Sequence, residues 1–180
     1  MNLVKWMGVL GCTLVLGACG SNVSSQAANS QASSTTTSEM TRMSLSQVTM
    51  TDLDGNTVRL SDYQGKKVYL KFWASWCSIC LAGLPDVEEL AKQEQDFVVL
   101  SVVAPGVRRE QNLEDFKKWY RDLGYQHLPV LVDENATLMK QLGVAGFPTS
   151  AFVNEKGEVV SVHPGHLRSE QIVSLMNKVQ

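Results

Sequence analysis

The stretch that decides the fold is Tyr69-Leu70-Lys71-Phe72-Trp73-Ala74-Ser75-Trp76-Cys77-Ser78-Ile79-Cys80. Its first part is almost continuously apolar, which predicts a β-strand that is covered on both faces of a sheet. Cys77 and Cys80 follow at a spacing that allows two thiols on the first turn of a helix to close a small disulfide ring. Such a ring can form and break without unfolding the protein, so the stretch predicts a strand, a reactive turn and a helix in succession.

The first residues of the 180-residue chain are typical of an export signal. Lys5 supplies a positive charge, and the run that follows it is apolar or small as far as Ala18, except for Thr13. This run is shorter than the roughly 20 residues that span a bilayer. The ending Leu16-Gly17-Ala18-Cys19 resembles the lipobox of bacterial lipoproteins, which implies a signal peptide over residues 1–18 and a lipid on Cys19. A signal that is cleaved without lipidation, or that is kept as an anchor, is the alternative.

A polar segment separates this signal from the rest of the chain. Residues 20–46 consist mainly of Ser, Thr, Ala, Asn and Gln, and their only charges are Glu39 and Arg42. Because such a segment cannot bury enough apolar surface to fold, we predict a flexible, lipidated tether over residues 19–46. Residues 47–180 have the composition of an ordinary globular protein and the length of one domain.

The net charge and the number of cysteines limit the classes of protein to which this chain can belong. The net charge is −2, so nothing in the composition favours binding to nucleic acid or another polyanion. Cys12 lies in the predicted signal and Cys19 carries the predicted lipid, which leaves Cys77 and Cys80 as the cysteines of the domain. A single pair is too sparse for a disulfide framework, and in an exported protein it favours a chemical role over a structural one.

We expect no bound metal, and no cofactor besides the redox-active disulfide itself. A zinc site would need two or three ligands beyond Cys77 and Cys80, and the domain has no second cysteine pair. A copper-delivery site would need a histidine ligand, whereas His163 and His166 are predicted in a loop and His127 at the edge of a strand.

Apolar periodicity and turn residues predict alternating strands and helices. A hairpin is expected at 48–60, with Asp54-Gly55 in its turn. The helix predicted at 81–95 should kink at Pro85, since proline breaks the hydrogen bonding of a helix. The other expected elements are strands at 97–104 and 129–132, helices at 112–123 and 135–142, a hairpin of strands 149–154 and 158–163, and a final helix capped by Ser169. This order predicts a mixed sheet with helices on both faces.

These elements carry a family resemblance. The order of a strand, Trp76-Cys77-Ser78-Ile79-Cys80, a helix with Pro85 and the later Gly146-Phe147-Pro148-Thr149 resembles the thioredoxin fold. The hairpin at Asp54-Gly55 and the extra strand and helix between residues 97 and 142 are more similar to the membrane-anchored, TlpA/ResA-like branch. The resemblance implies an α/β thioredoxin-like fold with an N-terminal β-hairpin and an inserted strand-helix unit.

The chemistry of the cysteine pair follows from thiol reactivity. A thiolate is the attacking species, and its pKa falls at the N-terminus of a helix, where N–H groups favour negative charge. We therefore expect Cys77 to be the nucleophile that attacks a substrate disulfide. Cys80, one turn later and more shielded, is expected to be the resolving thiol. A static structural disulfide is the alternative.

A substrate groove is expected around the pair. It consists of Trp76, Ser78, Ile79, Phe147 and Pro148. By resemblance, Pro148 is a cis proline, and the residue before it faces the disulfide. A trans proline that only begins the next strand is the alternative. Trp73, in contrast, is expected to face the core.

Two positions depart from the family pattern. Thioredoxins carry a buried acid where this chain has Lys71, and ResA-like proteins carry a glutamate where it has Gly83. The usual proton acceptor for Cys80 is therefore missing at both places. One hypothesis is that Lys71 reaches beneath the disulfide and favours the thiolate by its charge. The other is that its side chain points outward into solvent.

The direction of electron flow rests on resemblance alone. Surface-tethered thioredoxin-like lipoproteins of Gram-positive bacteria are similar, which implies a lipid-anchored reductant on the extracytoplasmic face of the cell membrane. It would receive electrons from a CcdA-type membrane thiol transporter and pass them to a surface methionine sulfoxide reductase. The alternatives are a ResA-like reductant in cytochrome c maturation and an oxidase that forms disulfides in exported proteins. We expect a monomer.

Overall fold

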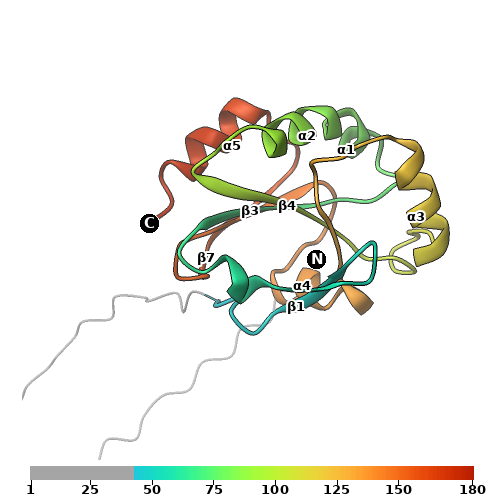
Figure 1. The fold of residues 1–180 in the computed structure, drawn as a ribbon, viewed down its shortest axis with the longest axis horizontal. Coiled ribbons are helices and arrows are strands. Elements are labelled where there is room, and N and C mark those ends of the chain that lie inside the picture. The colour runs from blue at the N-terminus through green and yellow to red at the C-terminus, as the bar shows by residue number, and fades with distance from the viewer. Residues whose placement is uncertain (1–42) are drawn as a thin grey trace, which may run out of the picture. The chain divides into compact units, whose positions relative to one another are not determined.

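The computed structural model describes residues 43–180, which form a seven-stranded mixed sheet with helices on both faces (Figure 1). The strand order across the sheet is β2-β1-β5-β4-β3-β6-β7. The strands are β1 (Thr49–Asp52), β2 (Thr57–Arg59), β3 (Lys67–Phe72), β4 (Phe97–Val103), β5 (Val130–Val132), β6 (Thr149–Val153) and β7 (Val159–Pro164). Strands β3, β4 and β5 are parallel to one another, whereas the hairpins at both edges are antiparallel. This is the predicted α/β architecture.

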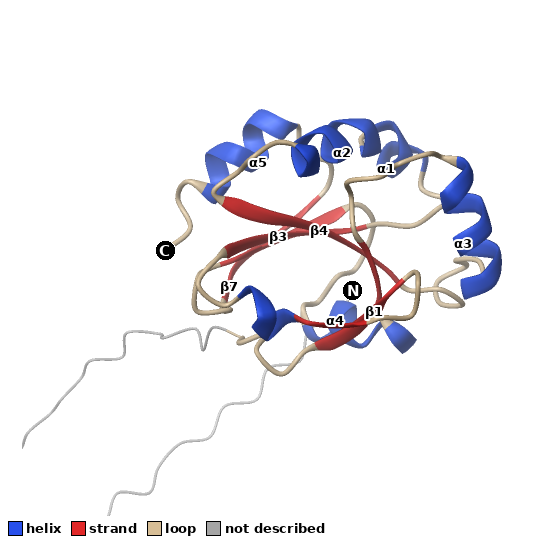
Figure 2. Cartoon of the chain, viewed as in Figure 1, coloured by secondary structure: helices blue, strands red, loops and turns tan. Residues whose placement is uncertain are grey.

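The helices divide between the two faces of this sheet (Figure 2). They are α1 (Ser78–Ala82), α2 (Leu84–Lys92), α3 (Leu113–Asp122), α4 (Thr137–Gln141) and α5 (Ser169–Met176), with short 3-10 helices η1 (Leu60–Tyr63) and η2 (Glu134–Ala136). Helices α1, α2 and α5 cover one face, and α4 and η1 cover the other. The face under α1 and α2 is the one that presents the cysteines.

Strand β3 lies between β4 and β6 and is buried on both faces, as its apolar sequence predicts. Tyr69 and Trp73 belong to the core beneath α2 and α5, and Leu70 and Phe72 belong to the core on the opposite face. All four side chains are fully buried. Because successive side chains of a strand point to opposite faces, Lys71 lies on the same face as Tyr69 and Trp73.

The helix after the cysteines is interrupted close to the predicted kink. Helix α1 ends at Ala82, Gly83 caps it, and α2 begins at Leu84 with Pro85 in its first turn. A proline is tolerated there because the first N–H groups of a helix have no partner within the helix. The break is therefore a junction between two helices, and it lies three residues after Cys80.

The cap predicted for the last helix is wrong by one residue. The N-cap of α5 is Arg168, whose backbone N–H donates to Oε1 of Gln171 at 3.0 Å. The hydroxyl of Ser169 instead donates to the backbone oxygen of Asp86 at 3.3 Å. Ser169 thus links α5 to α2 instead of capping its own helix.

The folded domain begins a few residues earlier than the composition predicts. Leu45, placed by composition in the tether, is 1% exposed, and its N–H donates to the oxygen of Gly157 at 2.8 Å. The N–H of Val159 donates to the oxygen of Met43 at 2.8 Å, so residues 43–46 pack along the last hairpin. The predicted signal, Cys19 and most of the tether lie outside the described residues. Between residues 43 and 180, no helix is both long and apolar enough to span a bilayer.

Glu88 joins α2 to the loop that leads into β5. Its carboxylate accepts hydrogen bonds from the backbone N–H groups of Gln126 (3.0 Å), His127 (2.9 Å) and Leu128 (2.7 Å), and its Oε1 lies 2.9 Å from Nδ1 of His127. Burial acts to raise the pKa of Glu88, but these hydrogen bonds outweigh it and hold the pKa below its ordinary value. The Glu88 carboxylate therefore binds three consecutive backbone N–H groups and stabilises the conformation of this loop.

Candidate active site

The two predicted cysteines form a disulfide at the start of α1. The S–S distance is 2.05 Å, and the two Cα atoms are 5.2 Å apart. Cys77 is the N-cap of the helix, and its sulfur accepts a hydrogen bond from the N–H of Cys80 at 3.2 Å. Cys77 is 6% exposed and Cys80 is 0% exposed, so substrate has access only from the side of Cys77. The same N–H would stabilise a Cys77 thiolate after reduction.

An apolar surface adjoins the disulfide, where the groove was predicted. Trp76 and Ile79 are large apolar side chains left exposed, at 45% and 53%. The ring of Phe147 packs edge-on against that of Trp76, with 5.9 Å between the centroids. The Phe147–Pro148 peptide bond is cis, as the resemblance implies. Ser78 is exposed beside these residues.

Trp73 has the core position predicted for it. It is fully buried, and its ring contacts those of Phe116 at 5.7 Å, Trp119 at 6.1 Å and Tyr120 at 6.1 Å. Helix α3 therefore packs directly on the residue that ends the β3 stretch. This aromatic cluster supports the turn that carries Cys77.

The loop between β4 and α3 is part of the site, which the sequence analysis missed. Glu110 is 7% exposed, and its carboxylate accepts hydrogen bonds from the N–H of Ser75 (2.6 Å), the hydroxyl of Ser75 (2.5 Å) and the N–H of Gln111 (2.7 Å). Gln111 also donates to the Ser75 hydroxyl at 3.2 Å. This network fixes the β4–α3 loop to the residue two positions before Cys77. A glutamate that follows two arginines reads as a solvated charge, so no sequence signal indicated this contact.

The same loop places two arginines on the aromatic surface. The guanidinium carbon of Arg109 lies 5.0 Å from the centre of the Trp76 ring, and that of Arg108 lies 5.8 Å from the centre of the Phe147 ring. Both distances are in the range of cation–π contacts. The rim of the site is therefore cationic as well as aromatic.

Lys71 is buried, so the hypothesis that it points into solvent is wrong. Its side chain is 1% exposed and lies between Ser101 of β4 and Ser150 of β6 in the register of the sheet. Burial lowers the pKa of Lys71 from 10.5 to about 8, while the charge of Asp86 on α2 acts in the opposite direction. A basic side chain with a lowered pKa thus lies in the core on the face of the sheet that α1 and α2 cover.

The other departure from the family pattern, Gly83, is explained by His166. Gly83 is buried, and a Cβ built on it would lie 2.5 Å from Cε1 and 2.8 Å from Nδ1 of His166. Nδ1 of His166 is itself buried without a hydrogen-bond partner among the described residues. The sequence analysis placed His166 in a loop without a role, because the spacing of a loop gives no information about which helix it covers.

The other histidines are engaged away from the disulfide. Nε2 of His163 lies 3.2 Å from the Ser161 hydroxyl, and its ring packs on Phe152, while His127 contacts Glu88. In the described part of the chain, no group of three or more His, Cys, Asp or Glu side chains could hold a metal ion.

Comparison with known proteins assigns the family. The Redoxin family model matches residues 27–178. The crystal structure of the pneumococcal exposed lipoprotein thioredoxin Etrx1 from Streptococcus pneumoniae is similar, with 51% identity, a TM-score of 0.71, and coverage of 73% of this chain and 98% of that chain. The N-terminal domain of PilB from Neisseria gonorrhoeae is 30% identical, with a TM-score of 0.66, covering 74% of this chain and 88% of that chain.

A curated relative adds the activity. The thiol-disulfide oxidoreductase ResA of Bacillus thuringiensis is 30% identical over 130 residues, which are 72% of this chain and 73% of the relative. The matched region contains the cysteine pair that forms the disulfide at the start of α1. This chain belongs to the Redoxin family and is a thioredoxin-like thiol-disulfide oxidoreductase of the ResA/TlpA-like kind.

Proposed function

We propose that this protein is an extracytoplasmic reductant that delivers electrons to a surface methionine sulfoxide reductase. The observation that carries the proposal is the 51% identity with an exposed lipoprotein thioredoxin, over 98% of that chain. The export signal and the lipobox-like ending at Cys19 support a lipid anchor on the outer face of the cell membrane. The recipient and a CcdA-type membrane donor are inferred from the family resemblance of the sequence.

In the proposed reaction, the reduced pair transfers two electrons to a substrate disulfide. The Cys77 thiolate attacks one substrate sulfur, forms a mixed disulfide and displaces the other sulfur as a thiolate, which takes a proton. The Cys80 thiolate then attacks Cys77 Sγ, which closes the Cys77–Cys80 disulfide and releases the second substrate thiol. The membrane donor restores the dithiol by the same exchange and is itself oxidised. The exposure of Cys77 and the burial of Cys80 support this assignment of roles.

Lys71 is the group that we propose to tune the thiols. Burial lowers its pKa to about 8, so near neutral pH its side chain is still mainly an ammonium, and this buried positive charge favours the thiolate form of the cysteine pair. Titration of thiolate absorbance in the reduced Lys71→Met variant tests this role. We expect a higher thiolate pKa than in the wild type, and an unchanged curve would remove Lys71 from the mechanism.

The reduction potential tests the direction of electron flow. A reductant should have a potential near that of thioredoxin, about −270 mV, and an oxidase a value near about −120 mV. The measurement is equilibration of the full-length protein with glutathione or dithiothreitol buffers. A value near the oxidising end would replace the proposal with disulfide formation in exported proteins.

Trapping of the mixed disulfide tests which protein receives the electrons. In the Cys80→Ala variant the second step cannot occur, so the substrate should remain attached to Cys77 as a mixed disulfide. We expect mass spectrometry of the trapped adduct to identify a methionine sulfoxide reductase. The matched control is the Cys77→Ala/Cys80→Ala variant, which should trap nothing. Adducts with apocytochrome c would instead assign the protein to cytochrome c maturation.

A further inference from the structure

We propose that Arg108 and Arg109 select substrate segments that carry acidic side chains beside the reactive cysteine. The inference rests on thiol-disulfide exchange at Cys77 and names the class of segment that this site prefers. The two guanidinium groups lie over Phe147 and Trp76, and these rings contact each other at 5.9 Å. Both positive charges therefore lie over the aromatic rings of the apolar surface that adjoins the disulfide.

The backbone holds both arginines in an uncommon conformation. Their φ angles are 50° for Arg108 and 67° for Arg109, in the left-handed region that residues other than glycine rarely adopt. Such a conformation persists only where surrounding contacts impose it. Here the Glu110 carboxylate fixes the end of the loop to Ser75, and the N–H of Glu110 donates to the oxygen of Val107 at 2.9 Å. The loop is thus held in a form that directs two adjacent arginines to the site.

Neither guanidinium has an acidic partner among residues 43–180. Both side chains are exposed, and their contacts are the stacking contacts on the two rings. Glu110 is adjacent in sequence, but its carboxylate is buried and accepts hydrogen bonds from Ser75 and Gln111.

Three other cations of the described residues differ from these arginines, because a nearby side chain supplies each of them with a carboxylate. Lys92, Lys117 and Arg121 pair with Glu89, Glu114 and Asp54 at 3.6, 3.2 and 3.7 Å. Arg108 and Arg109 therefore keep their N–H donors available to a ligand.

The chemistry of these donors indicates an acidic protein segment. A guanidinium that is already stacked on an aromatic ring is oriented in advance and binds a carboxylate with two parallel hydrogen bonds. The net charge of the chain is −2, so the attraction is local to the site and not a property of the whole molecule. Because Arg109 lies over Trp76, the residue directly before Cys77, a carboxylate bound to the arginines belongs to a segment whose cysteine is within reach of the disulfide.

Peptide substrates test the preference directly. Three peptides of one length each carry a single cysteine in a mixed disulfide with 2-mercaptoethanol, flanked by Glu, Gln or Lys. The reduced full-length protein converts each to a free peptide thiol and 2-mercaptoethanol and is oxidised to the Cys77–Cys80 disulfide. Each rate constant is divided by the rate for dithiothreitol, which corrects for the intrinsic reactivity of the peptide. We expect the Glu peptide to react about tenfold faster than the Lys peptide at low salt, and this ratio should fall at high salt.

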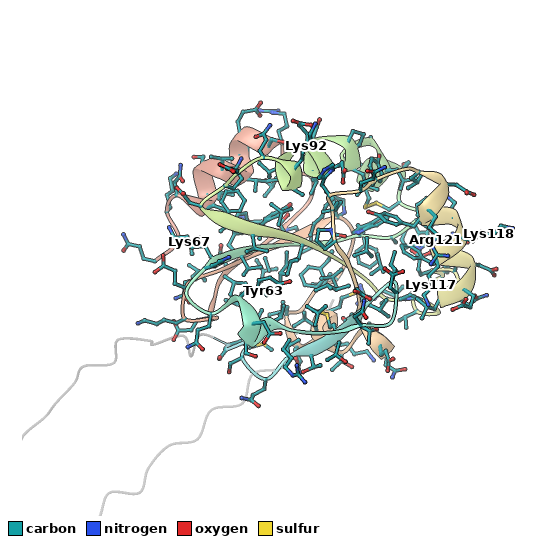
Figure 3. All side chains as sticks on the ribbon, in the orientation of Figure 1. Tyr63, Lys67, Lys92, Lys117, Lys118 and Arg121 are labelled. Carbon is teal, nitrogen blue, oxygen red and sulfur yellow. A yellow bond between two sulfur atoms is a disulfide. The ribbon has the colours of Figure 1, made fainter. Side chains whose placement is uncertain are left out.

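Variants assign the preference to the arginines. In the Arg108→Gln/Arg109→Gln variant the Glu-to-Lys rate ratio should fall to within about twofold. In the Arg108→Lys/Arg109→Lys variant the ratio should be intermediate, because lysine keeps the charge but not the planar, two-point hydrogen bonding. The matched control is Arg121→Gln on α3 (Figure 3), which should keep the wild-type ratio. The salt dependence of the Glu-to-Lys rate ratio in the wild type tests the electrostatic preference without relying on the folding of any variant.

The possible outcomes distinguish a failure of the acidic preference from a failure of the thiol-disulfide exchange on which it rests. Equal corrected rates for the Glu and Lys peptides in the wild type, or an unchanged ratio in the double Gln variant, would overturn the acidic preference alone. A protein that reduced none of the three peptides would contradict the exchange activity itself. Equal peptide rates together with an arginine-dependent preference for phosphatidylglycerol over phosphatidylcholine vesicles would assign the arginines to the membrane surface and overturn the proposal.

Discussion

The imidazole of His166 occupies the space that a side chain at Gly83 would take, since a Cβ there would lie 2.5 Å from Cε1 of His166. Gly83 has a φ of −97°, which any residue adopts, so the glycine is explained by the close ring and not by the backbone. The loop after β7 thus closes on the junction between α1 and α2, three residues from Cys80.

A double-mutant cycle should measure this contact. Gly83→Ala should displace the ring, and the gain in helix propensity should offset part of that cost. In the His166→Ala background, the same substitution should stabilise the protein by about 0.5–1 kcal/mol because the clash is gone. We expect a coupling free energy of at least about 1 kcal/mol from urea unfolding of the four proteins. Additive changes would show that the two residues do not compete for this space.

Lys71→Met should stabilise the oxidised protein at neutral pH. The shift of the Lys71 pKa from 10.5 to about 8 corresponds to a cost of about 3 kcal/mol for burying the charge. That cost is fully present below pH 8. As the pH rises from about 8 towards 10.5, the unfolded chain binds more protons than the folded protein, so the stability of the wild type should rise. Methionine has a similar volume and no charge, so we expect a gain of about 2 kcal/mol at pH 7 that shrinks as the pH rises.

Urea unfolding at pH 7 and at pH 9.5 checks this pH dependence. The matched control is Lys92→Met, whose side chain is 56% exposed on α2, and which should leave both the stability and its pH dependence nearly unchanged (Figure 3). A loss of stability in Lys71→Met at pH 7 would contradict the burial of a costly charge.

Glu110→Gln should loosen the turn that precedes Cys77. The substitution replaces a buried carboxylate that accepts from Ser75 and Gln111, which should lower the free energy of unfolding by about 2 kcal/mol. The Ser75 amide should exchange with solvent faster, since its acceptor is weakened. Hydrogen exchange monitored by NMR checks this, with Glu114→Gln on the exposed surface of α3 as the control. Equal protection of Ser75 in both variants would show that the carboxylate does not hold the turn.

Glu88→Gln should destabilise the protein in a manner that depends on pH. The folded pKa of Glu88 is below its ordinary value of 4.5, so its contribution is present above pH 4.5 and is lost as the pH falls through the folded pKa. We expect the variant to be less stable by about 2 kcal/mol at pH 6, and the difference should shrink towards pH 3. Thermal unfolding at several pH values checks this. Glu89→Gln, whose side chain is 57% exposed, should show neither effect.

Much of the fold could be predicted because its signals are local. The apolar run before Cys77 predicted a doubly covered strand, and Asp54-Gly55 predicted the first hairpin turn. The cap at Ser169 was wrong because its hydroxyl bonds to Asp86 on another helix, and sequence spacing contains no information about such a contact. The start of the domain was placed late because Leu45 is a lone apolar residue in a polar segment, and only its pairing partner shows that it is buried.

The sequence by itself determined the strand, the cysteine pair, the helix and the later proline, because each is specified by residues adjacent in the chain. Tertiary structure alone decided the surroundings of the pair. It buried Lys71 beneath α1 and α2, placed His166 against Gly83, and directed Arg108 and Arg109 onto the aromatic surface. Apart from Lys71, these residues lie on loops, and their roles depend on contacts between segments far apart in the sequence.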